Sequence, residues 1–409
     1  MTDIASPPRM DDHFIQDPHA LYRRLQEERP VAEVITPEQS RAWLITRYAD
    51  VRAALADPRL SKDSRQLGEL FHRRVEGPQG YLGELSQHML NTDPPDHARL
   101  RTLVNKAFTA RRVELLRPRI EAITSVLLDR IAGRDEVDLL DVLAVPLPIT
   151  VICELLGVPD GDRDDFRRWS NTLLSVGVPE QVFRDAMTSM VGYLTELALS
   201  KREHPADDML SALVEARDAE DRLTEGELIS TAFLLLVAGH ETTVNLIGNG
   251  MLALLRDPDQ LAALRADRSL LSGAVEEFLR YEGPLNHATL RFTAEPVTIG
   301  GVLIPADEFV IVAVGAANRD PDRYPEPDQL DIGRDAGGHM AFGHGIHYCL
   351  GAPLARLEAQ IAFAALLDRF EYLALAVEPD ALRWRQSSLI RGLTTLPVRL
   401  TPPNQGSES

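Results

Sequence analysis

The sequence of 409 residues contains only two cysteines, Cys153 and Cys349. Two thiols do not provide a disulfide framework, so each cysteine needs its own explanation. Cys153 lies in the apolar segment 151–156, where a small buried hydrophobic residue is the ordinary interpretation. Cys349 lies in a glycine-rich segment, and it is the cysteine for which a chemical role has to be considered.

The sequence also lacks long hydrophobic runs and an excess of positive charge. Its most apolar stretch, residues 232–238, is far shorter than the roughly 20 residues that span a bilayer, and it indicates a buried helix. The N-terminal segment has neither a cationic region followed by an apolar one nor an anchor helix, so we expect a cytoplasmic protein. With 62 acidic and 43 basic side chains, the net charge of −19 argues against nucleic-acid and anionic-membrane partners.

The apolar periodicity predicts a mainly α chain with small β-sheets. Between about residues 94 and 200, apolar side chains recur every three or four positions, which is the helical period. The capping-box spacing of Thr224 and Glu227 predicts a helix that extends to about Arg256, long enough to cross the molecule.

The other elements are expected to be shorter. The patterns predict helices at 50–56, 273–281 and 353–370, and strands at 43–48, 288–292, 297–299, 309–314 and near 400. Residues 318–338 are rich in Pro, Asp and Gly, which predicts an ordered loop with a functional reason for its length. Without a repeat, a linker or a shift in composition, residues 1–409 are expected to form one domain, frayed at about 1–12 and 401–409.

The cysteine segment, Phe342 to Gly351, reads FGHGIHYCLG and precedes a predicted helix. A thiolate that binds iron must be charged and protected, so backbone N–H groups and a helix N-terminus should face the sulfur. Gly343, Gly345 and Gly351 would permit positive φ and a tight turn against a flat macrocycle. Phe342 would shield the sulfur from water.

Two other interpretations stay open from the residues alone. A glycine-rich turn before a helix often holds a cysteine that is only packed. A zinc site formed by His344, His347 and Cys349 is the second alternative, although no CxxC pair accompanies these residues.

The segment matches every fixed position of Phe-x-x-Gly-x-His-x-Cys-x-Gly. It therefore resembles the haem-binding signature of the bacterial cytochrome P450 family, in particular actinobacterial macrolide and polyketide hydroxylases. The resemblance implies a P450 fold with haem b between the long central helix and the helix after the cysteine. It also implies that Cys349 is the axial ligand of the iron, that His347 reaches a propionate, and that Phe342 and Gly343 pack against the ring.

Ala238-Gly239-His240-Glu241-Thr242 lies within the long predicted helix. Glycine inside a helix costs about 1 kcal/mol relative to alanine, and close approach of a cofactor to Ala238 and Gly239 would explain it. A bond from Thr242 back to the carbonyl of Ala238 would loosen the helix and open a groove for a diatomic ligand. A kinked core helix with an incidental acid is the alternative. The segment resembles the family's oxygen-binding motif, which assigns Thr242 and Glu241 to proton delivery.

Glu277 and Arg280 are three residues apart on one side of a predicted helix. Most such pairs are solvated surface contacts, but the apolar neighbours here indicate a buried helix, where an ion pair needs further hydrogen-bonding partners. The segment resembles the family's Glu-x-x-Arg motif, and Arg334 is the expected third member of its structural network. The family often has Phe where this chain has Leu330.

Haem carries two propionates, which require cations. Asp93 is expected to cap a helix that has Pro94 at its first position, with His97 and Arg101 on one face. Arg291, on a predicted strand, would add a third cation. Each residue alone would be an ordinary surface charge, but in this order they resemble the family's propionate ligands.

The implied function is that of a monooxygenase that uses dioxygen and two electrons to hydroxylate or epoxidise a bulky apolar molecule. Neither a fused flavin region nor a four-cysteine cluster is present, so ferredoxin and ferredoxin reductase are the expected electron donors. Basic residues between 97 and 120, including Arg111 and Arg112, form either a ferredoxin docking patch or a solvated face. A non-hydroxylating haem-thiolate enzyme and a haem-binding sensor are the alternative functions.

The resemblance also implies a substrate pocket and a lid over it. The lid is expected within residues 66–90. The expected lining is mostly apolar and suits a macrolide, polyketide, terpenoid or steroid. It consists of Leu234, Val237, Ala238, Leu285, Asn286, His287, Ala288, Leu389 and Ile390.

Overall fold

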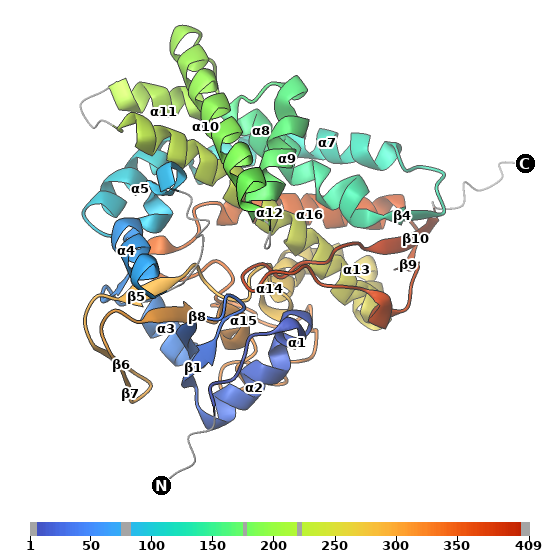
Figure 1. The fold of residues 1–409 in the computed structure, drawn as a ribbon. Coiled ribbons are helices and arrows are strands. Elements are labelled where there is room, and N and C mark those ends of the chain that lie inside the picture. The colour runs from blue at the N-terminus through green and yellow to red at the C-terminus, as the bar shows by residue number, and fades with distance from the viewer. Residues whose placement is uncertain (1–5, 75–82, 175–177, 219–222, 402–409) are drawn as a thin grey trace, which may run out of the picture.

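The computed structural model describes residues 6–74, 83–174, 178–218 and 223–401 (Figure 1). Two helices cross the middle of the molecule, α12 (Glu225–Arg256) and α16 (Ala352–Arg369). A helical part lies on one side of them and a sheet-containing part on the other (Figure 1). This arrangement confirms the predicted class, mainly α with small sheets. Among the described residues, no helix combines the length and the apolarity that a membrane crossing requires.

The helical part consists of the elements predicted between residues 94 and 200, followed by one further helix. It contains α5 (Asp96–Ala107), α6 (Ala110–Leu115), α7 (Arg117–Asp129), α8 (Pro146–Leu156), α9 (Arg163–Leu174), α10 (Glu180–Glu203) and α11 (Met209–Asp218). Their apolar faces share one core cluster with α12, α16 and α14 (Leu271–Tyr281). The helix α13 (Pro258–Ala266) follows α12.

Helix α12 is 32 residues long and begins with the predicted capping box. The Thr224 hydroxyl accepts a hydrogen bond from the Glu227 N–H, and the Glu227 carboxylate accepts one from the Thr224 N–H. The helix packs against α8, α14 and α16, so most of its middle residues are buried on all sides. The predicted end at Arg256 is also confirmed.

The largest sheet has five strands in the order β1-β2-β8-β5-β3. These are β1 (Val31–Ile35), β2 (Arg41–Ile45), β8 (Phe309–Val312), β5 (Arg291–Thr293) and β3 (Leu60–Ser61). Strand β3 pairs antiparallel with β5, so that Leu60 lies opposite Thr293 and Ser61 opposite Phe292. The edge formed by β3 and β5 supplies charged residues to the site described below.

Two smaller sheets complete the β part. One has the order β4-β10-β9, formed by β4 (Glu136–Asp138), β10 (Pro397–Thr401) and β9 (Tyr372–Leu375). The other is the hairpin of β6 (Val297–Ile299) and β7 (Val302–Ile304). Between β8 and α16, only the short α15 (Val314–Ala317) and a 3-10 turn at Gly345–His347 are regular, which confirms the predicted irregular loop at 318–338.

Several boundaries differ from the predictions. The strand expected at 43–48 ends at Ile45, because the Asp320 carboxylate accepts a hydrogen bond from the Tyr48 N–H and Tyr48 begins α3 (Tyr48–Ala56). The strand expected at 288–292 is reduced to β5.

The predicted helix cap at Asp93 is wrong. Helix α5 begins at Asp96, with Pro95 before it and no side-chain cap. The Asp93 carboxylate instead accepts hydrogen bonds from the Ser61 hydroxyl and the Lys62 N–H, and it therefore ties α5 to the end of β3.

The expected fraying of the ends is only partly testable. Met10 is buried and its N–H donates to the Ile35 carbonyl at 2.8 Å, and α1 (Asp12–Gln16) and α2 (Pro18–Glu28) follow. The N-terminal segment is therefore ordered from before residue 12. Residues 1–5 and 402–409 lie outside the described residues.

Candidate functional site

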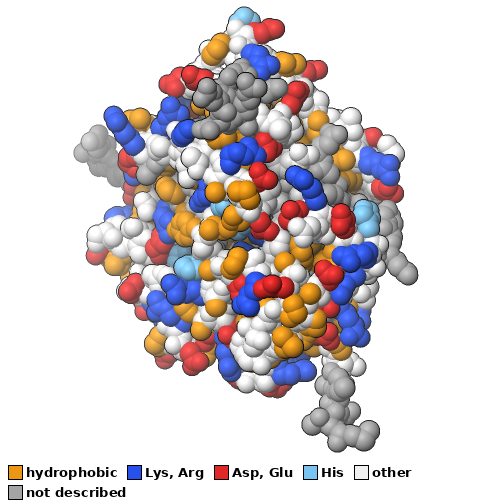
Figure 2. All heavy atoms as spheres, turned by 90° about the vertical axis from the view of Figure 1, so that its left-hand side faces the viewer, with side chains coloured by type: hydrophobic (Ala, Val, Ile, Leu, Met, Phe, Trp, Pro, Cys, Tyr) orange, Lys and Arg blue, Asp and Glu red, His pale blue; other side chains and the backbone are white. Residues whose placement is uncertain are grey.

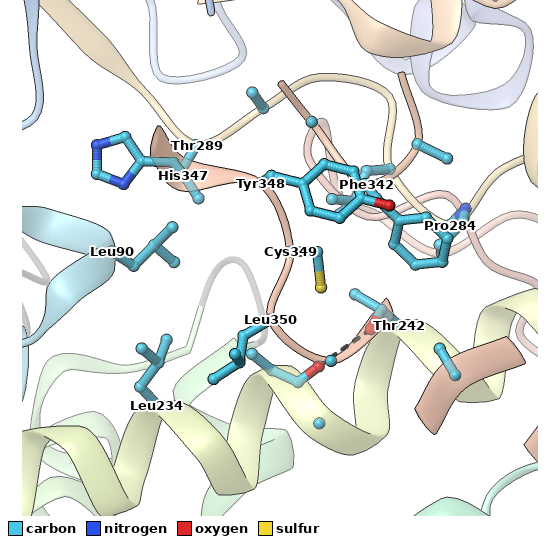
Figure 3. A pocket seen from close by; sticks show the side chains of 18 of the residues that line it. Leu90, Leu234, Thr242, Pro284, Thr289, Phe342, His347, Tyr348, Cys349 and Leu350 are labelled. Atoms are coloured by element: carbon cyan, nitrogen blue, oxygen red, sulfur yellow. Dashed lines mark hydrogen bonds between the residues drawn. The ribbon is translucent and has the colours of Figure 1, made fainter. Parts of the chain in front are cut away.

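A cavity lies between α12 and the cysteine segment, with an empty volume of about 1460 Å³ that includes its opening to solvent. Cys349, Thr242 and Arg291 are among the residues that line it. Figure 3 shows the Cys349 sulfur pointing from its segment toward α12, where Leu234 and Thr242 face it from the opposite wall. The cavity thus brings together the two strongest motifs of the sequence.

The cysteine segment is folded back on itself. The Cys349 N–H donates to the Phe342 carbonyl at 2.9 Å, which closes the turn. Gly343 and Gly345 have φ of 72° and 75°, in the left-handed region that favours glycine, as predicted. The prediction of positive φ for Gly351 is wrong, because this residue has φ of −76° and directly precedes α16.

The sulfur lies at the N-terminus of α16. Gly351 precedes this helix and no side-chain oxygen caps it, while the N–H groups of Gly351 and Ala352 donate to the Cys349 sulfur. Burial raises the pKa of the Cys349 thiol, and these N–H groups together with Arg101 and Arg356 act in the opposite direction. The site thus provides the donors that a thiolate needs, and a bound metal ion would complete its deprotonation.

The zinc alternative is not supported by the geometry. Within the described ranges, no group of three or more His, Cys, Asp or Glu side chains is placed to hold a metal ion. His347 instead packs against His97, with ring centroids 4.4 Å apart. A cysteine that is only packed is not supported either, because Cys349 lines the cavity and is exposed. A single sulfur ligand is the interpretation that fits these observations.

The expected propionate ligands gather at one end of the cavity. His97 and Arg291 are buried, and His97 Nε2 and Arg291 Nε have no hydrogen-bond partner within the described part of the chain. The other Arg291 nitrogens donate to the Leu60 and Leu55 carbonyls at 3.3 and 3.2 Å. Arg101 donates to two carbonyls of the cysteine segment, those of Ile346 at 2.9 Å and Tyr348 at 2.6 Å.

This end of the cavity has an excess of positive charge. Burial, followed by the charges of Lys62 and Arg291, lowers the pKa of His347 to about 2. Burial and the charges of Arg101 and Lys62 likewise lower the pKa of His97. Both imidazoles are therefore neutral donors near pH 7. Unpaired donors beside uncompensated cations fit an anionic group such as a carboxylate.

The motif on α12 has the predicted hydrogen bond. The Thr242 hydroxyl donates to the Ala238 carbonyl at 3.0 Å (Figure 3). Similar bonds return from Thr243 to the Gly239 carbonyl at 3.4 Å and from the Asn245 amide to the Glu241 carbonyl at 2.8 Å. The side chains of this stretch therefore bond extensively to the helix backbone, although the helix continues without a break.

Gly239 lines the cavity, where a cofactor was expected to approach it closely. The close contact that the structure shows is instead with a neighbouring helix. A Cβ atom at Gly239 would lie 2.9 Å from Ile152 of α8. Contact between two packed helices therefore explains this glycine, in addition to any contact with a cofactor.

Glu241 is buried and does not line the cavity, whereas the adjacent Thr242 does. The Glu241 carboxylate accepts a hydrogen bond from Arg385, and its other oxygen lies 3.9 Å from His240 Nε2. Arg385 belongs to the segment before β10, and sequence reasoning missed this partner because no motif marks it.

The Glu277 network forms as expected. Arg280 donates twice to the Glu277 carboxylate, and Arg334 Nε lies 3.4 Å from the same carboxylate. Further Arg280 hydrogen bonds go to the carbonyls of Asn318, Pro327 and Gln329. The network thus fastens α14 to the irregular loop before the cysteine segment.

Four of the nine residues expected to line the substrate pocket do so. They are Leu234, Ala238, Leu285 and Ala288. Val237, Asn286, His287, Leu389 and Ile390 are not among the lining residues.

The residues that do not line the cavity are mainly engaged elsewhere. The segment at 285–288 pairs with 388–390: the Asn286 N–H donates to the Leu389 carbonyl, and the Asn286 amide donates to the Ser388 carbonyl. The buried His287 ring bonds to the carbonyl of Ala288. These contacts take the polar side chains out of the cavity wall.

Several lining residues were missed because ordinary apolar residues carry no motif. They include Met89, Leu90, Phe108, Ile152, Leu235 and Leu246. Met89 and Leu90 belong to the expected lid segment, in which α4 (Ser64–Arg74) is also formed. Residues 75–82 of that segment lie outside the described residues.

Comparisons with known proteins agree with this geometry. The family model described as Cytochrome P450 matches residues 180–392. Cytochrome P450 107B1 of Saccharopolyspora erythraea is 60% identical over 392 residues, which cover 95% of this chain and 96% of that protein. The chain belongs to the cytochrome P450 family. Its cofactor is therefore haem b, and the protein is a haem-thiolate monooxygenase.

Two further P450 proteins support the assignment. Cytochrome P450 monooxygenase PikC of Streptomyces venezuelae is 52% identical over 403 residues, with coverage of 97% of this chain and 95% of PikC. The tirandamycin C-bound structure of the P450 monooxygenase TamI superimposes with a TM-score of 0.91 at 54% identity, covering 97% of this chain and all of that one. The P450 fold is thus present over nearly the whole length.

The residues of this structure fit haem b. The Cys349 sulfur lines the cavity and would be a soft ligand for the iron, and the unpaired nitrogens of His97 and Arg291 lie among basic side chains suited to propionates. Cys349 would hold the iron, and His97, Arg101, Arg291 and His347 would hold the propionates.

Proposed function

We propose that this P450 hydroxylates or epoxidises a bulky, largely apolar secondary metabolite, with macrolides and other polyketides as the first candidates. The observation that carries the proposal is the largely apolar lining of the cavity into which the Cys349 sulfur points (Figure 3). This lining includes Met89, Leu90, Leu234, Ala238, Leu285 and Ala288. Such a wall binds by contact area rather than by charge, which suits a large hydrocarbon skeleton.

The names of relatives support the same class. 6-Deoxyerythronolide B hydroxylase of Saccharopolyspora erythraea is 46% identical, and mycinamicin IV hydroxylase/epoxidase of Micromonospora griseorubida is 43% identical. Vitamin D(3) 25-hydroxylase of Pseudonocardia autotrophica is 51% identical, so steroid-like compounds belong in the test as well.

We assign distinct roles to the residues around the cavity. Bound haem supplies an iron that activates dioxygen with two electrons. Cys349 would hold this iron through its sulfur and would donate electron density to it. The Thr242 hydroxyl, held by the Ala238 carbonyl, is placed at the cavity surface to pass a proton from its oxygen. Glu241 would supply protons to that position after release from Arg385.

The electron donors we propose are ferredoxin and ferredoxin reductase. The face shown in Figure 2, the left-hand side of Figure 1, carries α5, and hydrophobic, cationic and acidic side chains are mixed near its centre. Ile346 and Tyr348 of the cysteine segment are 50% and 40% exposed, and their carbonyls are bonded to Arg101 of α5. With the exposed Arg111 and Arg112 on α6, they offer an apolar centre and a basic rim to an acidic partner.

Two considerations extend this proposal. Charge reversal at Arg111 is expected to slow electron transfer mainly at low salt, because rim charges act on the association rate.

A cytoplasmic location is part of the same proposal, since reduction by a ferredoxin system that draws on NADPH requires access to the NADPH of the cytoplasm.

A compound screen tests the substrate class. Macrolactones, glycosylated macrolides, terpenoids and steroids are titrated into the ferric protein, and the Soret shift that accompanies loss of the iron's water ligand is recorded. Compounds that bind are incubated with a surrogate ferredoxin, its reductase and NADPH, and products one oxygen atom heavier are sought by mass spectrometry. A macrolide or polyketide that binds and gains oxygen supports the proposal.

Variants in the wall sharpen the test. Leu234→Phe narrows the cavity and is expected to weaken binding of the best ligand by about tenfold. Val237→Phe serves as the matched control, because Val237 lies on the same helix but is not among the lining residues. Turnover without added oxygen in the product would favour a non-hydroxylating enzyme. Ligand binding without any NADPH consumption would favour a sensor, and either result would reject the proposal.

A further inference from the structure

Lys62 follows β3 directly and is buried, with 3% of its surface exposed. Its backbone N–H donates to the Asp93 carboxylate at 3.1 Å, and its Nζ donates to the Thr289 hydroxyl at 2.5 Å. Both Lys62 and Thr289 line the same cavity as Cys349. A lysine is rarely buried to this extent without a partner for its charge.

Lys62 lies beside a second buried cation. The register of β3 and β5 pairs Leu60 with Thr293 and Ser61 with Phe292, and its continuation places Lys62 opposite Arg291. Directly opposed like charges on neighbouring strands destabilise a sheet. Burial, and after it the charge of Arg291, lowers the pKa of Lys62, which is the direction that two neighbouring basic groups would produce.

The two acids near this pair are engaged with other groups. Asp93 acts on both Lys62 and Arg291, but its carboxylate already accepts hydrogen bonds from the Ser61 hydroxyl and the Lys62 N–H. Asp57 also acts on Arg291, but its carboxylate is paired with Arg59 at 2.7 Å. The neighbouring imidazoles add no negative charge, and burial, followed by nearby positive charges, lowers the pKa of His88, His97 and His347. The Lys62 ammonium and the Arg291 guanidinium thus donate to a hydroxyl and to carbonyls, and no salt bridge to either is formed within the described residues.

We propose that Lys62 is a haem ligand of this protein, binding a propionate carboxylate together with Arg291. Two buried basic side chains match the two negative charges of the propionates, and the imidazoles of His97 and His347 line the same end. Arg101 also bonds to carbonyls of the cysteine segment. Lys62 thus adds a second buried basic group beside Arg291, which no motif of the sequence indicated. The proposal is independent of which substrate is oxidised.

The test compares haem retention and the reduction potential of the holoenzyme. Transfer of haem from the ferric protein to excess apomyoglobin is followed by absorbance. Lys62→Met is expected to lose haem about tenfold faster than the parent protein, because a charged hydrogen bond to a buried carboxylate is lost. Removal of a buried cation near the iron is also expected to shift the reduction potential to a more negative value.

Three matched variants separate charge from packing. Lys62→Gln keeps a donor for Thr289 without the charge and should behave like Lys62→Met, which also covers failure of the methionine variant to fold. Thr289→Val keeps the charge and should lose haem at the parental rate. Lys106→Met removes an exposed lysine outside the cavity lining and should change neither measurement.

The outcomes decide between two roles. Faster haem loss together with a more negative potential in both uncharged variants supports the proposal. Parental haem retention and potential in Lys62→Gln would overturn it. The proposal would also be overturned if the uncharged Lys62 variants lost haem faster at an unchanged reduction potential and Thr289→Val behaved in the same way. This is the result expected if Lys62 had only a structural role.

Discussion

The Arg280 guanidinium donates to both carboxylate oxygens of Glu277, each at 2.7 Å, and neither side chain is exposed to solvent. The Asp331 N–H donates to the same carboxylate at 3.0 Å. A buried pair of this kind is favourable only because almost every donor and acceptor has a partner. The pair connects α14 to the loop that leads into the cysteine segment, so its integrity affects the position of the haem ligand.

Arg280→Ala is expected to destabilise the protein by about 3–5 kcal/mol, because it leaves the Glu277 carboxylate buried and uncompensated. Urea unfolding and haem content of the purified protein measure the effect. The matched control is Arg117→Ala, which breaks an exposed pair with Glu114 at the same spacing and should cost less than about 1 kcal/mol. Equal costs for the two variants would show that burial of the pair has no energetic consequence.

Thr242→Ala removes the hydroxyl that lies at the cavity surface, 3.0 Å from the Ala238 carbonyl. NADPH consumption should continue, while product formed per NADPH falls about tenfold or more and hydrogen peroxide rises, because proton delivery is impaired. Parallel assays of NADPH, peroxide and product in the presence of a bound substrate measure this ratio. Thr242→Ser retains a hydroxyl and should stay close to the parent protein. Unchanged coupling in the alanine variant would remove Thr242 from the proton path.

Glu276 predicts a specific pH dependence of stability. Burial alone would raise the pKa of Glu276, but hydrogen bonds from Arg356 and His339 outweigh it and lower this pKa to about 2. A carboxyl with a depressed folded-state pKa stabilises the protein above its unfolded-state pKa of about 4.3, and this contribution is lost as the pH falls toward 2.

Glu276→Gln should therefore lower the free energy of unfolding by about 1 kcal/mol at pH 7, since solvent screens this partly exposed pair, and the difference from the parent protein should shrink between pH 4.5 and pH 3. Urea unfolding at a series of pH values gives both curves. Arg356 also lies over the Phe342 ring, 4.5 Å from its centroid, so the same variant is expected to loosen the cysteine segment. A constant difference at every pH would contradict the assigned pKa.

The fold class and the cysteine turn could be predicted from the sequence because both depend on local patterns, whereas Arg334 in the Glu277 network was expected only from the resemblance to the family. The capping box at Thr224 and the glycines at 343 and 345 specify local geometry directly. The function of Asp93 was predicted wrongly, because its partners lie 31 and 32 residues away at the end of β3.

Contacts distant in sequence account for the other differences. The Arg385 partner of Glu241 is 144 residues away, and Lys62 meets Thr289 across 227 residues. No local pattern contains such pairs. Sequence reasoning also placed Asn286 and His287 in the cavity wall, although hydrogen bonds to neighbouring carbonyls hold them outside it. Tertiary pairing therefore determines which side chains of a loop reach the cavity.

Gly239 provides a last test, of the contact between α8 and α12. Gly239→Ala would place a Cβ atom 2.9 Å from two carbons of Ile152, and this overpacking is expected to cost about 1–3 kcal/mol. Ile152→Ala removes both carbons and is expected to cost about 2–5 kcal/mol because it leaves a cavity. Since the added methyl group would enter that space, the double variant should be more stable than the sum of the two single effects implies. Urea unfolding of all four proteins measures this coupling, and strict additivity would contradict the explanation of Gly239 by its contact with Ile152.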